Sequence, residues 1–285
     1  MIKADFLVSL QKSNKTFMRN RIIIITALLA MVFPYRLAAE TDKGTAIVAH
    51  RGFWNCEAAG YAKNSIAALK CAQNAGFWGS EFDVNMTSDE VLLVFHDGKV
   101  EGKEIEKHPY EDFKYYRLKN GEPIPTLDEY LEQAKKHPET TLVYELKRHS
   151  CKKVEDRFVD LSIEKLKQYD MLDPSKVIFI SFSYNICKRL AEKLPEFTVQ
   201  YLNGEKAPKM LKKKGINGLD YNYKILKANP KWVSKARRLG MSTNTWTVNK
   251  EGDIKIMLNQ KIDMITTDNP LEAREVMKQM KIKEL

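Results

Sequence analysis

The chain has 285 residues, of which 44% are hydrophobic and 29% are charged, and these ordinary values exclude a mainly disordered protein and one wholly embedded in a membrane. Half of the formal net charge of +10 comes from residues 1–39, where six basic side chains accompany one acidic side chain. The rest of the chain then carries about +5 on scattered lysines, which favours a solvated basic surface over a nucleic-acid partner.

Residues 1–39 have the pattern of a secretory signal peptide. An uncharged apolar run, 22–33, follows Arg19 and Arg21 and is followed by small residues up to Ala39. The run is shorter than a comfortable membrane span, and its basic flank is typical of exported proteins. We expect cleavage near Ala39, export to the periplasm or out of the cell, and no stable membrane insertion afterwards. An uncleaved N-terminal anchor is the alternative.

Short β-rich apolar runs alternate with helical stretches across residues 40–285, which we treat as one domain. This alternation predicts βαβ units and a parallel sheet. Eight such runs in about 240 residues predict an α/β protein of the (β/α)8 TIM-barrel class. The eight runs are 45–50, 80–84, 141–146, 176–182, 197–202, 216–221, 242–248 and 263–267.

A ninth apolar run, 91–97, begins only four residues after SEFDVNM, which extends the second run to residue 86. Parallel neighbours need a crossover of about a dozen residues, so this run is expected to return along the second strand as a β-hairpin. Residues 98–124 are polar and lack a strong period, which indicates a small excursion over one end of the barrel. A helix is expected to follow, with Thr126 as its N-cap.

Four cysteines are present without a CxxC pair, which argues against a zinc site. In an oxidising compartment Cys56 and Cys71 could form a disulfide, and buried free thiols are the equal alternative. The other two cysteines are Cys151 and Cys187.

Three carboxylates lie on the second strand and on the strand after the hairpin. Glu81 and Asp83 are two residues apart, so on a strand both side chains point to the same face, and Glu145 with Lys147 has the same spacing. Buried carboxylates that repel one another must be protonated or must hold a cation. An all-oxygen ligand set selects a hard ion, Ca²⁺ or Mg²⁺. The alternative is that Glu81 and Asp83 only solvate an exposed sheet edge.

Two of the five histidines, His50 and His96, stand directly after apolar strand runs. Histidine titrates near neutrality and therefore suits proton transfer, and active sites of barrel enzymes lie at the carboxyl ends of the strands. Arg51 and Lys147 add cations at the same end, which together with a metal would form a pocket for an anion such as phosphate. A lone histidine is more often a hydrogen-bonded structural residue.

Eight short motifs, in their order and spacing, resemble the glycerophosphodiester phosphodiesterase family over about residues 45–277. They are HRG at 50–52, NS at 64–65, EFDV at 81–84, VFHD at 94–97, PTLDE at 125–129, ELK at 145–147, WTVN at 246–249 and TTDNP at 266–270.

The resemblance implies a role for each matching residue. His50 and His96 look like the family's catalytic acid and base, and Arg51 and Lys147 look like its phosphate contacts. The metal ligands would be Glu81, Asp83 and Glu145. Trp246 is similar to the aromatic residue that lines the alcohol pocket, with a core tryptophan on a barrel strand as the equal alternative.

Two departures from the family's pattern affect the substrate side. Lys63 stands where the family usually has glutamate before Asn64 and Ser65, and the stretch rich in arginine and threonine that commonly follows the HD pair is absent. Both changes leave the carboxylates and the histidines intact. The reaction class is therefore better supported by the resemblance than the substrate.

The activity that the resemblance implies is metal-dependent hydrolysis of a small-molecule glycerophosphodiester. The products would be glycerol 3-phosphate and an alcohol such as choline or ethanolamine. One rival is a phospholipase D-like phosphodiesterase that acts on a lysophospholipid or sphingomyelin. A rival from another class is a non-catalytic barrel that binds phosphodiesters. The sequence leaves the oligomeric state open.

Overall fold

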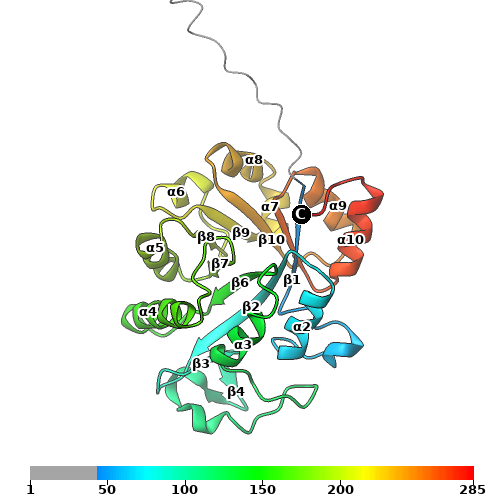
Figure 1. Ribbon diagram of the computed structural model, residues 1–285. Coiled ribbons are helices and arrows are strands. Elements are labelled where there is room, and N and C mark those ends of the chain that lie inside the picture. The colour runs from blue at the N-terminus through cyan, green and yellow to red at the C-terminus, as the bar shows by residue number, and fades with distance from the viewer. Residues whose placement is uncertain (1–43) are drawn as a thin grey trace, which may run out of the picture. The chain divides into compact units, whose positions relative to one another are not determined.

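Eight parallel strands close into a barrel within residues 44–285, the part of the chain that this computed structural model describes (Figure 1). They are β1 (Ala46–Ala49), β2 (Gly79–Met86), β6 (Thr141–Leu146), β7 (Val177–Ser181), β8 (Thr198–Tyr201), β9 (Gly218–Asn222), β10 (Ser242–Trp246) and β11 (Met264–Thr267). Around the barrel their order is β1-β11-β10-β9-β8-β7-β6-β2, and the pairing of β2 with β1 closes it. Each predicted run forms one strand, so the predicted TIM barrel is confirmed. The predicted signal peptide lies outside the described residues.

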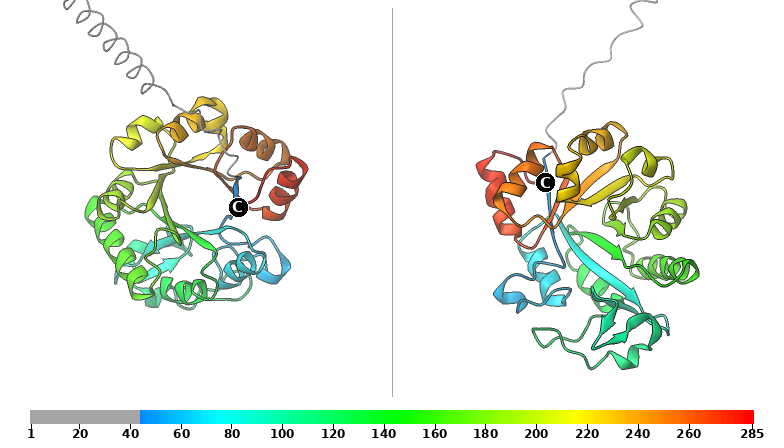
Figure 2. Two further views of the ribbon diagram at one scale, coloured as in Figure 1. Left: turned by 45° about the horizontal axis from the view of Figure 1, so that its top comes forward. Right: turned by 180° about the vertical axis from the view of Figure 1, so that it is seen from behind.

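Helices cover the outside of the strands and form the outer ring in the left view of Figure 2. Several begin at a side chain that caps the first turn, as Ser65 does for α2. Thr126 and Glu129 form a capping box at the start of α3, which confirms the predicted N-cap. The helices are α2 (Ile66–Asn74), α3 (Leu127–Ala134), α4 (Lys152–Gln168), α5 (Tyr184–Lys193), α6 (Pro208–Lys212), α7 (Tyr223–Ala228), α8 (Lys231–Arg238), α9 (Glu251–Asn259) and α10 (Pro270–Gln279).

The barrel strands are buried on both faces, which explains why their sequences are near-continuous apolar runs rather than strict alternations. The main core lies between strands and helices and includes the stacked rings of Phe82 and Tyr130, 4.4 Å apart. A smaller cluster fills the barrel interior: Ala46, Val48, Val143, Ile178, Ile180, Leu202 and Met264. Charged and polar side chains join this cluster toward the carboxyl ends of the strands.

The ninth run forms the predicted hairpin. Its strand β3 (Leu92–Val94) pairs antiparallel with β2, with Val94 opposite Val84. The excursion that follows extends away from the barrel beside β3 in Figure 1. It contains a two-stranded ribbon, β4 (Lys99–Val100) with β5 (Lys103–Glu104), and two short 3-10 turns. It also has a small apolar cluster of its own: Ala62, Leu93, Val100, Ile105, Phe113, Leu118 and Ile124. The irregular spacing of these residues explains why the sequence shows no period there.

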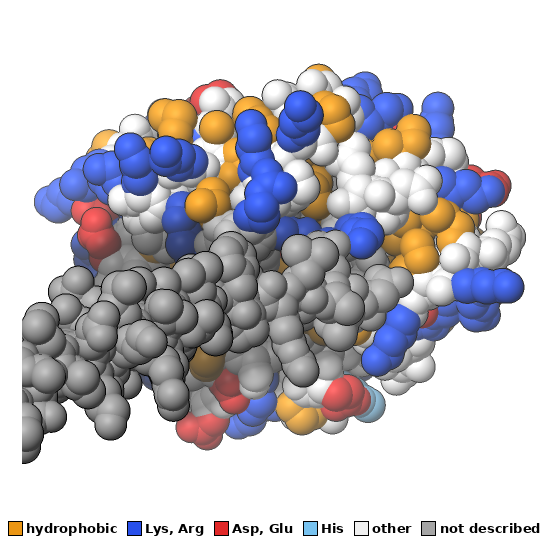
Figure 3. All heavy atoms as spheres, turned by 90° about the horizontal axis from the view of Figure 1, so that it is seen from above, with side chains coloured by type: hydrophobic (Ala, Val, Ile, Leu, Met, Phe, Trp, Pro, Cys, Tyr) orange, Lys and Arg blue, Asp and Glu red, His pale blue; other side chains and the backbone are white. Residues whose placement is uncertain are grey.

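The four cysteines are free thiols in the structure. Only Cys187 is buried, whereas Cys56 and Cys71 are half-buried, and the thiol of Cys56 donates to the backbone oxygen of Phe53 at 3.2 Å. Burial, together with Cys56, raises the pKa of Cys71 to about 12. Within residues 44–285 no helix is both long and apolar enough to cross a membrane. On the face seen in Figure 3, lysine and arginine side chains are spread among apolar and uncharged ones.

Candidate active site

A cavity of about 240 Å³ opens at the carboxyl ends of the barrel strands. This is the end at which barrel enzymes carry their active sites. The cavity receives side chains from many strands, which brings residues from positions 50 to 266 of the chain together. Its lining consists of His50, Arg51, Glu81, His96, Glu145, Ile180, Phe182, Leu202, Asp220, Trp246, Thr247 and Thr266.

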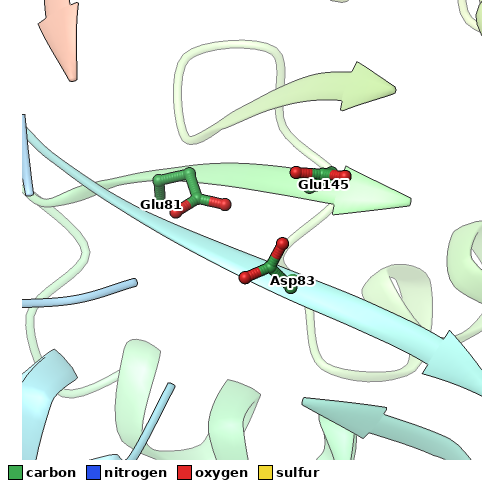
Figure 4. A group of neighbouring side chains, drawn as sticks. All are labelled: Glu81, Asp83 and Glu145. Atoms are coloured by element: carbon green, nitrogen blue, oxygen red, sulfur yellow. The ribbon is translucent and has the colours of Figure 1, made fainter. Parts of the chain in front are cut away.

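The three predicted metal ligands converge in the structure. Asp83 on β2 lies directly beside Glu145 on β6 in the parallel register. Glu81 lies two residues before Asp83, on the same face of β2. One carboxylate oxygen from each residue lies within 4.8 Å of the other two (Figure 4). All three side chains are almost fully buried. The alternative of an exposed sheet edge is therefore wrong.

The residues present fit a hard divalent cation. Two oxygens that both coordinate one Ca²⁺ are at most about 5.2 Å apart, and the observed separations lie below that limit. Burial, then Asp83, raises the pKa of Glu145 to about 8, and burial with both neighbouring carboxylates raises the pKa of Glu81. Three buried carboxylates therefore do not all carry a charge at neutral pH without a cation among them.

Basic side chains flank this carboxylate cluster on one side. The Lys147 ammonium lies 2.8 Å from Glu145 Oε1 and 3.1 Å from Asp83 Oδ1. The guanidinium Nε of Arg51 lies 3.4 Å from Asp83 Oδ2. Burial alone would raise the pKa of Asp83, but Lys147 and the other cations hold that pKa below its ordinary range. Lys147 and Arg51 are thus placed where an anionic substrate would meet them.

Two non-glycine residues beside the cluster have left-handed backbone conformations. Arg51 has φ +55° and donates its backbone N–H to Glu81 Oε2 at 2.7 Å. Asn64 has φ +59°, and its side-chain amide donates to Asp83 Oδ2 at 2.9 Å. A β-carbon at Gly52 would lie 2.7 Å from the backbone of Ala68 in α2, so only glycine fits after Arg51. Two residues that hold the carboxylates thus have a backbone conformation that costs free energy for a non-glycine residue.

His50 is held from the neighbouring strand. Its Nδ1 lies 2.8 Å from Asp268 Oδ1, and its Nε2 faces Glu81 Oε2 at 3.9 Å. Asp268 also accepts hydrogen bonds from Trp54 at 3.0 Å and from Asn249 at 2.6 Å. Burial would raise the pKa of Asp268, but His50 and these donors lower it. The ring of His50 therefore has a fixed orientation, with Nε2 directed at the carboxylate cluster.

His96 reaches the cavity from the hairpin. Its Nδ1 lies 2.7 Å from Oδ1 of Asp97, the next residue in the chain. Burial lowers the pKa of His96, and the cations Lys147 and Arg51 lower it further against the opposite effect of Asp83. The two predicted histidines thus line one cavity, on elements far apart in the sequence.

Trp246 lines the cavity and also packs against the apolar interior of the barrel. Its ring contacts Phe182 edge-to-face at 5.4 Å. Lys63 is exposed, and its ammonium lies 4.4 Å from the centre of the Trp54 ring rather than in the cavity. Its positive charge is therefore outside the cavity lining.

Three residues of the site were not predicted to act there. Asp268 belongs to the TTDNP motif and Asn64 to the NS motif. The motifs therefore included both residues, but the sequence assigned neither of them a physical role. Asp220 lines the cavity from β9, where the sequence shows only an ordinary strand. A polar residue in a buried barrel strand is the signal that would have found it.

Comparison with known proteins agrees with this geometry. Residues 50–272 match the family model described as the glycerophosphoryl diester phosphodiesterase family. A glycerophosphodiester phosphodiesterase of Bacillus altitudinis is 28% identical over 254 residues, which cover 83% of this chain and all of that relative.

Solved structures show the same likeness. A glycerophosphodiester phosphodiesterase of Parabacteroides distasonis is 39% identical with a TM-score of 0.81, over 84% of this chain and 98% of that one. A phosphodiesterase of Oleispira antarctica, solved in complex with the product sn-glycerol-3-phosphate, is 25% identical with a TM-score of 0.70, over 82% and 97%. The chain belongs to the glycerophosphoryl diester phosphodiesterase family.

Proposed function

We propose that this chain hydrolyses glycerophosphodiesters to sn-glycerol 3-phosphate and an alcohol with the help of a divalent cation. The observation that carries the proposal is one cavity in which two histidines from distant elements flank a buried cluster of three carboxylates. The product complex of the Oleispira antarctica relative supports a glycerol phosphate as the common half of the substrates.

In this proposal Glu81, Asp83 and Glu145 hold Ca²⁺ or Mg²⁺. When bound, such an ion polarises the phosphoryl oxygens and stabilises the negative charge that develops on them. Arg51 and Lys147, which lie beside the same carboxylates, orient the phosphate by charge-assisted hydrogen bonds.

The two histidines move the protons. One imidazole removes the proton of the nucleophile, and the other protonates the alcohol that leaves. For His50, the Asp268 carboxylate orients the ring and stabilises the imidazolium form. The apolar walls of the cavity limit access of water to the reacting groups.

The decisive experiment is an assay of the purified protein against glycerophosphocholine, glycerophosphoethanolamine, a lysophospholipid and sphingomyelin. We expect sn-glycerol 3-phosphate from the first two substrates, loss of turnover in excess chelator, and recovery on adding Ca²⁺ or Mg²⁺. Full activity in chelator would contradict the metal role. Preference for the lipid substrates, or binding without turnover, would support one of the rival functions instead.

A pair of variants separates the cluster from buried carboxylates in general. Glu145→Gln removes a proposed ligand, and Glu155→Gln removes a carboxylate that is equally buried on α4, where it accepts a hydrogen bond from Ser183. We expect only Glu145→Gln to abolish the response of activity to the added cation. A similar response in both variants would mean that the cluster does not hold the ion.

We also propose that the protein is exported after removal of residues 1–39. The basic flank, the apolar run and the small residues near Ala39 support this proposal. Mass spectrometry of the protein from its native cell fractions tests it. An N-terminus near residue 40 in the periplasmic or external fraction is expected, and an intact N-terminus in the membrane fraction would support the anchored alternative.

A further inference from the structure

Asp220 is a carboxyl group that the proposed reaction does not use. It projects from β9 into the cavity, and its side chain is 1% exposed. Its Oδ1 is buried and has no hydrogen-bond partner among residues 44–285. Buried polar atoms in folded proteins nearly always have a partner, so an unpartnered oxygen on a residue that lines a cavity points to a partner group on a ligand.

The surroundings of Asp220 differ from those of the metal-ligand cluster. Glu145 and Asp83 have Lys147 beside them, whereas Oδ1 of Asp220 has no partner among residues 44–285. Four apolar side chains share the cavity lining with Asp220: Ile180, Phe182, Leu202 and Trp246. A single polar group on an apolar wall is the arrangement that fixes the orientation of a small ligand in a binding pocket.

Trp246 presents its ring rather than its N–H to this part of the cavity. The indole Nε1 donates to the backbone oxygen of Asp220 at 3.0 Å, so the N–H group is already satisfied. The ring therefore offers its face to a ligand, where it can contact C–H groups, and the hydrogen bond to the backbone fixes the ring next to residue 220. Together they form a site for a molecule with both C–H and O–H groups, such as a small polyol.

An unpartnered carboxyl oxygen on a wall with apolar side chains matches a hydroxyl group of a ligand, because a hydroxyl group can donate a hydrogen bond to it. The glycerol half of a glycerophosphodiester supplies such hydroxyl groups.

We propose that Asp220 binds a hydroxyl group of the glycerol half of the substrate and selects glycerol phosphate over phosphate esters without hydroxyl groups. The proposal rests on the proposed function, because it takes the phosphate to lie at the metal-ligand cluster of the same cavity. The glycerol half is common to all glycerophosphodiesters, whereas the alcohol half varies, so a fixed hydrogen-bonding group in the cavity can recognise the glycerol half in every substrate.

Binding measurements test this inference without requiring turnover. The full-length protein, loaded with Ca²⁺ or Mg²⁺, is titrated calorimetrically with sn-glycerol 3-phosphate and with n-propyl phosphate, which lacks both hydroxyl groups. We expect the parent protein to prefer glycerol phosphate by about 10- to 100-fold, the range that one buried hydrogen bond supplies. Asp220→Leu should reduce the preference to within about threefold while the affinity for propyl phosphate is kept.

Two further variants control for effects on folding. Asp220→Asn keeps a group that donates and accepts, so it should retain part of the preference. Gln200→Leu removes another buried side chain with an unpartnered oxygen, on the neighbouring strand β8 but outside the cavity lining, and should leave the preference unchanged. Since Asp220→Leu removes an unsatisfied buried carboxyl group, it should unfold at a temperature no lower than the parent.

Three outcomes would overturn the inference. Asp220→Leu could keep the parental preference, or it could weaken both ligands equally. Asp220→Leu could also lose a preference for phosphocholine over propyl phosphate while it still selects glycerol phosphate. That result would mean that Asp220 binds a cationic alcohol rather than glycerol. A parent protein that selects glycerol phosphate but hydrolyses no glycerophosphodiester would refute the proposed function and leave this subsite standing.

Discussion

The two histidines of the cavity are supported by two differently built regions. His50 follows β1 and is bonded to Asp268, which follows the adjacent strand β11, so two barrel strands fix its ring. His96 lies beyond β3 and is bonded to Asp97, its own neighbour. The side chains of His50 and Asp268 are 16% and 20% exposed, whereas those of His96 and Asp97 are 40% and 69% exposed.

This difference concerns the side chain more than the backbone. The amide of Asn85 on β2 donates to the backbone oxygens of Phe95, at 2.7 Å, and Asp97, at 3.3 Å, and so holds the hairpin on both sides of His96. The His96 ring itself is bonded to Asp97, and both of these side chains are partly exposed. His50, one of the two proposed proton-transfer groups, is therefore held by two barrel strands, whereas His96 is held by a bond to its own neighbour in the chain.

The largest expected effect comes from removing the histidines themselves. His50→Ala or His96→Ala should each lower kcat by about 10² to 10⁴, because a proton-transfer group is lost while the proposed metal ligands remain. Binding of a glycerophosphodiester should stay close to parental. The double variant should be little slower than the slower single variant if both groups act on one transition state.

His137→Ala is the matched control for these variants. His137 is 41% exposed and paired with Glu139, much as His96 is paired with Asp97, but it lies outside the cavity lining. Its removal should leave kcat unchanged. If His50→Ala or His96→Ala keeps the parental kcat, that histidine takes no part in the mechanism.

A smaller effect is expected from removing the carboxylates that pair with the histidines. Here we expect kcat to fall more for the partner of His50 than for the partner of His96. Asp268→Asn keeps the shape but removes the charge that orients His50, and should lower kcat by about 10- to 100-fold, as loss of a supporting carboxylate typically does. Asp97→Asn should change kcat by less than about threefold, since exposed ion pairs contribute little. Steady-state kinetics with both variants measures the contrast. Equal losses would show that the barrel does not preorganise His50 more than the hairpin does His96.

The smallest effect is on stability and depends on pH. The folded-state pKa of Asp268 lies below its unfolded value, so its contribution to stability is present above about pH 4 and is lost as the pH falls through the folded value. Asp268→Asn should therefore unfold a few degrees below the parent at pH 7, and the difference should shrink at about pH 3. Thermal unfolding followed by circular dichroism across this range is the measurement. A difference independent of pH would mean that the charge of Asp268 plays no part.

The sequence predicted the barrel because its signals are local. Eight buried strands carry near-continuous apolar runs, and the short link before residue 91 permits only a hairpin. The convergence of Glu81 and Asp83 followed from their spacing on one strand. Glu145 joined them because parallel strands end at the same side of the sheet.

The parts that could not be predicted depend on contacts between distant residues. The bond between His50 and Asp268 joins positions 218 residues apart. Nothing in the local pattern indicates that they are neighbours until β1 pairs with β11. Asp220 was missed because an aspartate in a strand is distinguished only by which strands surround it and by the partner that its oxygen lacks. The excursion was read as polar because its buried residues do not repeat at a fixed interval.

The left-handed backbone conformation at Arg51 and Asn64 lowers the stability of the protein, but the side chains at both positions are needed for the proposed activity. Each such residue costs on the order of 1 kcal/mol, which glycine at the same position would not incur. Asn64→Gly, however, would remove the amide that holds Asp83, and glycine at position 51 would remove a guanidinium from the proposed phosphate site. A search for thermostable variants of this protein should therefore leave positions 51 and 64 unchanged and look for its gains on the helices, away from the carboxyl ends of the strands.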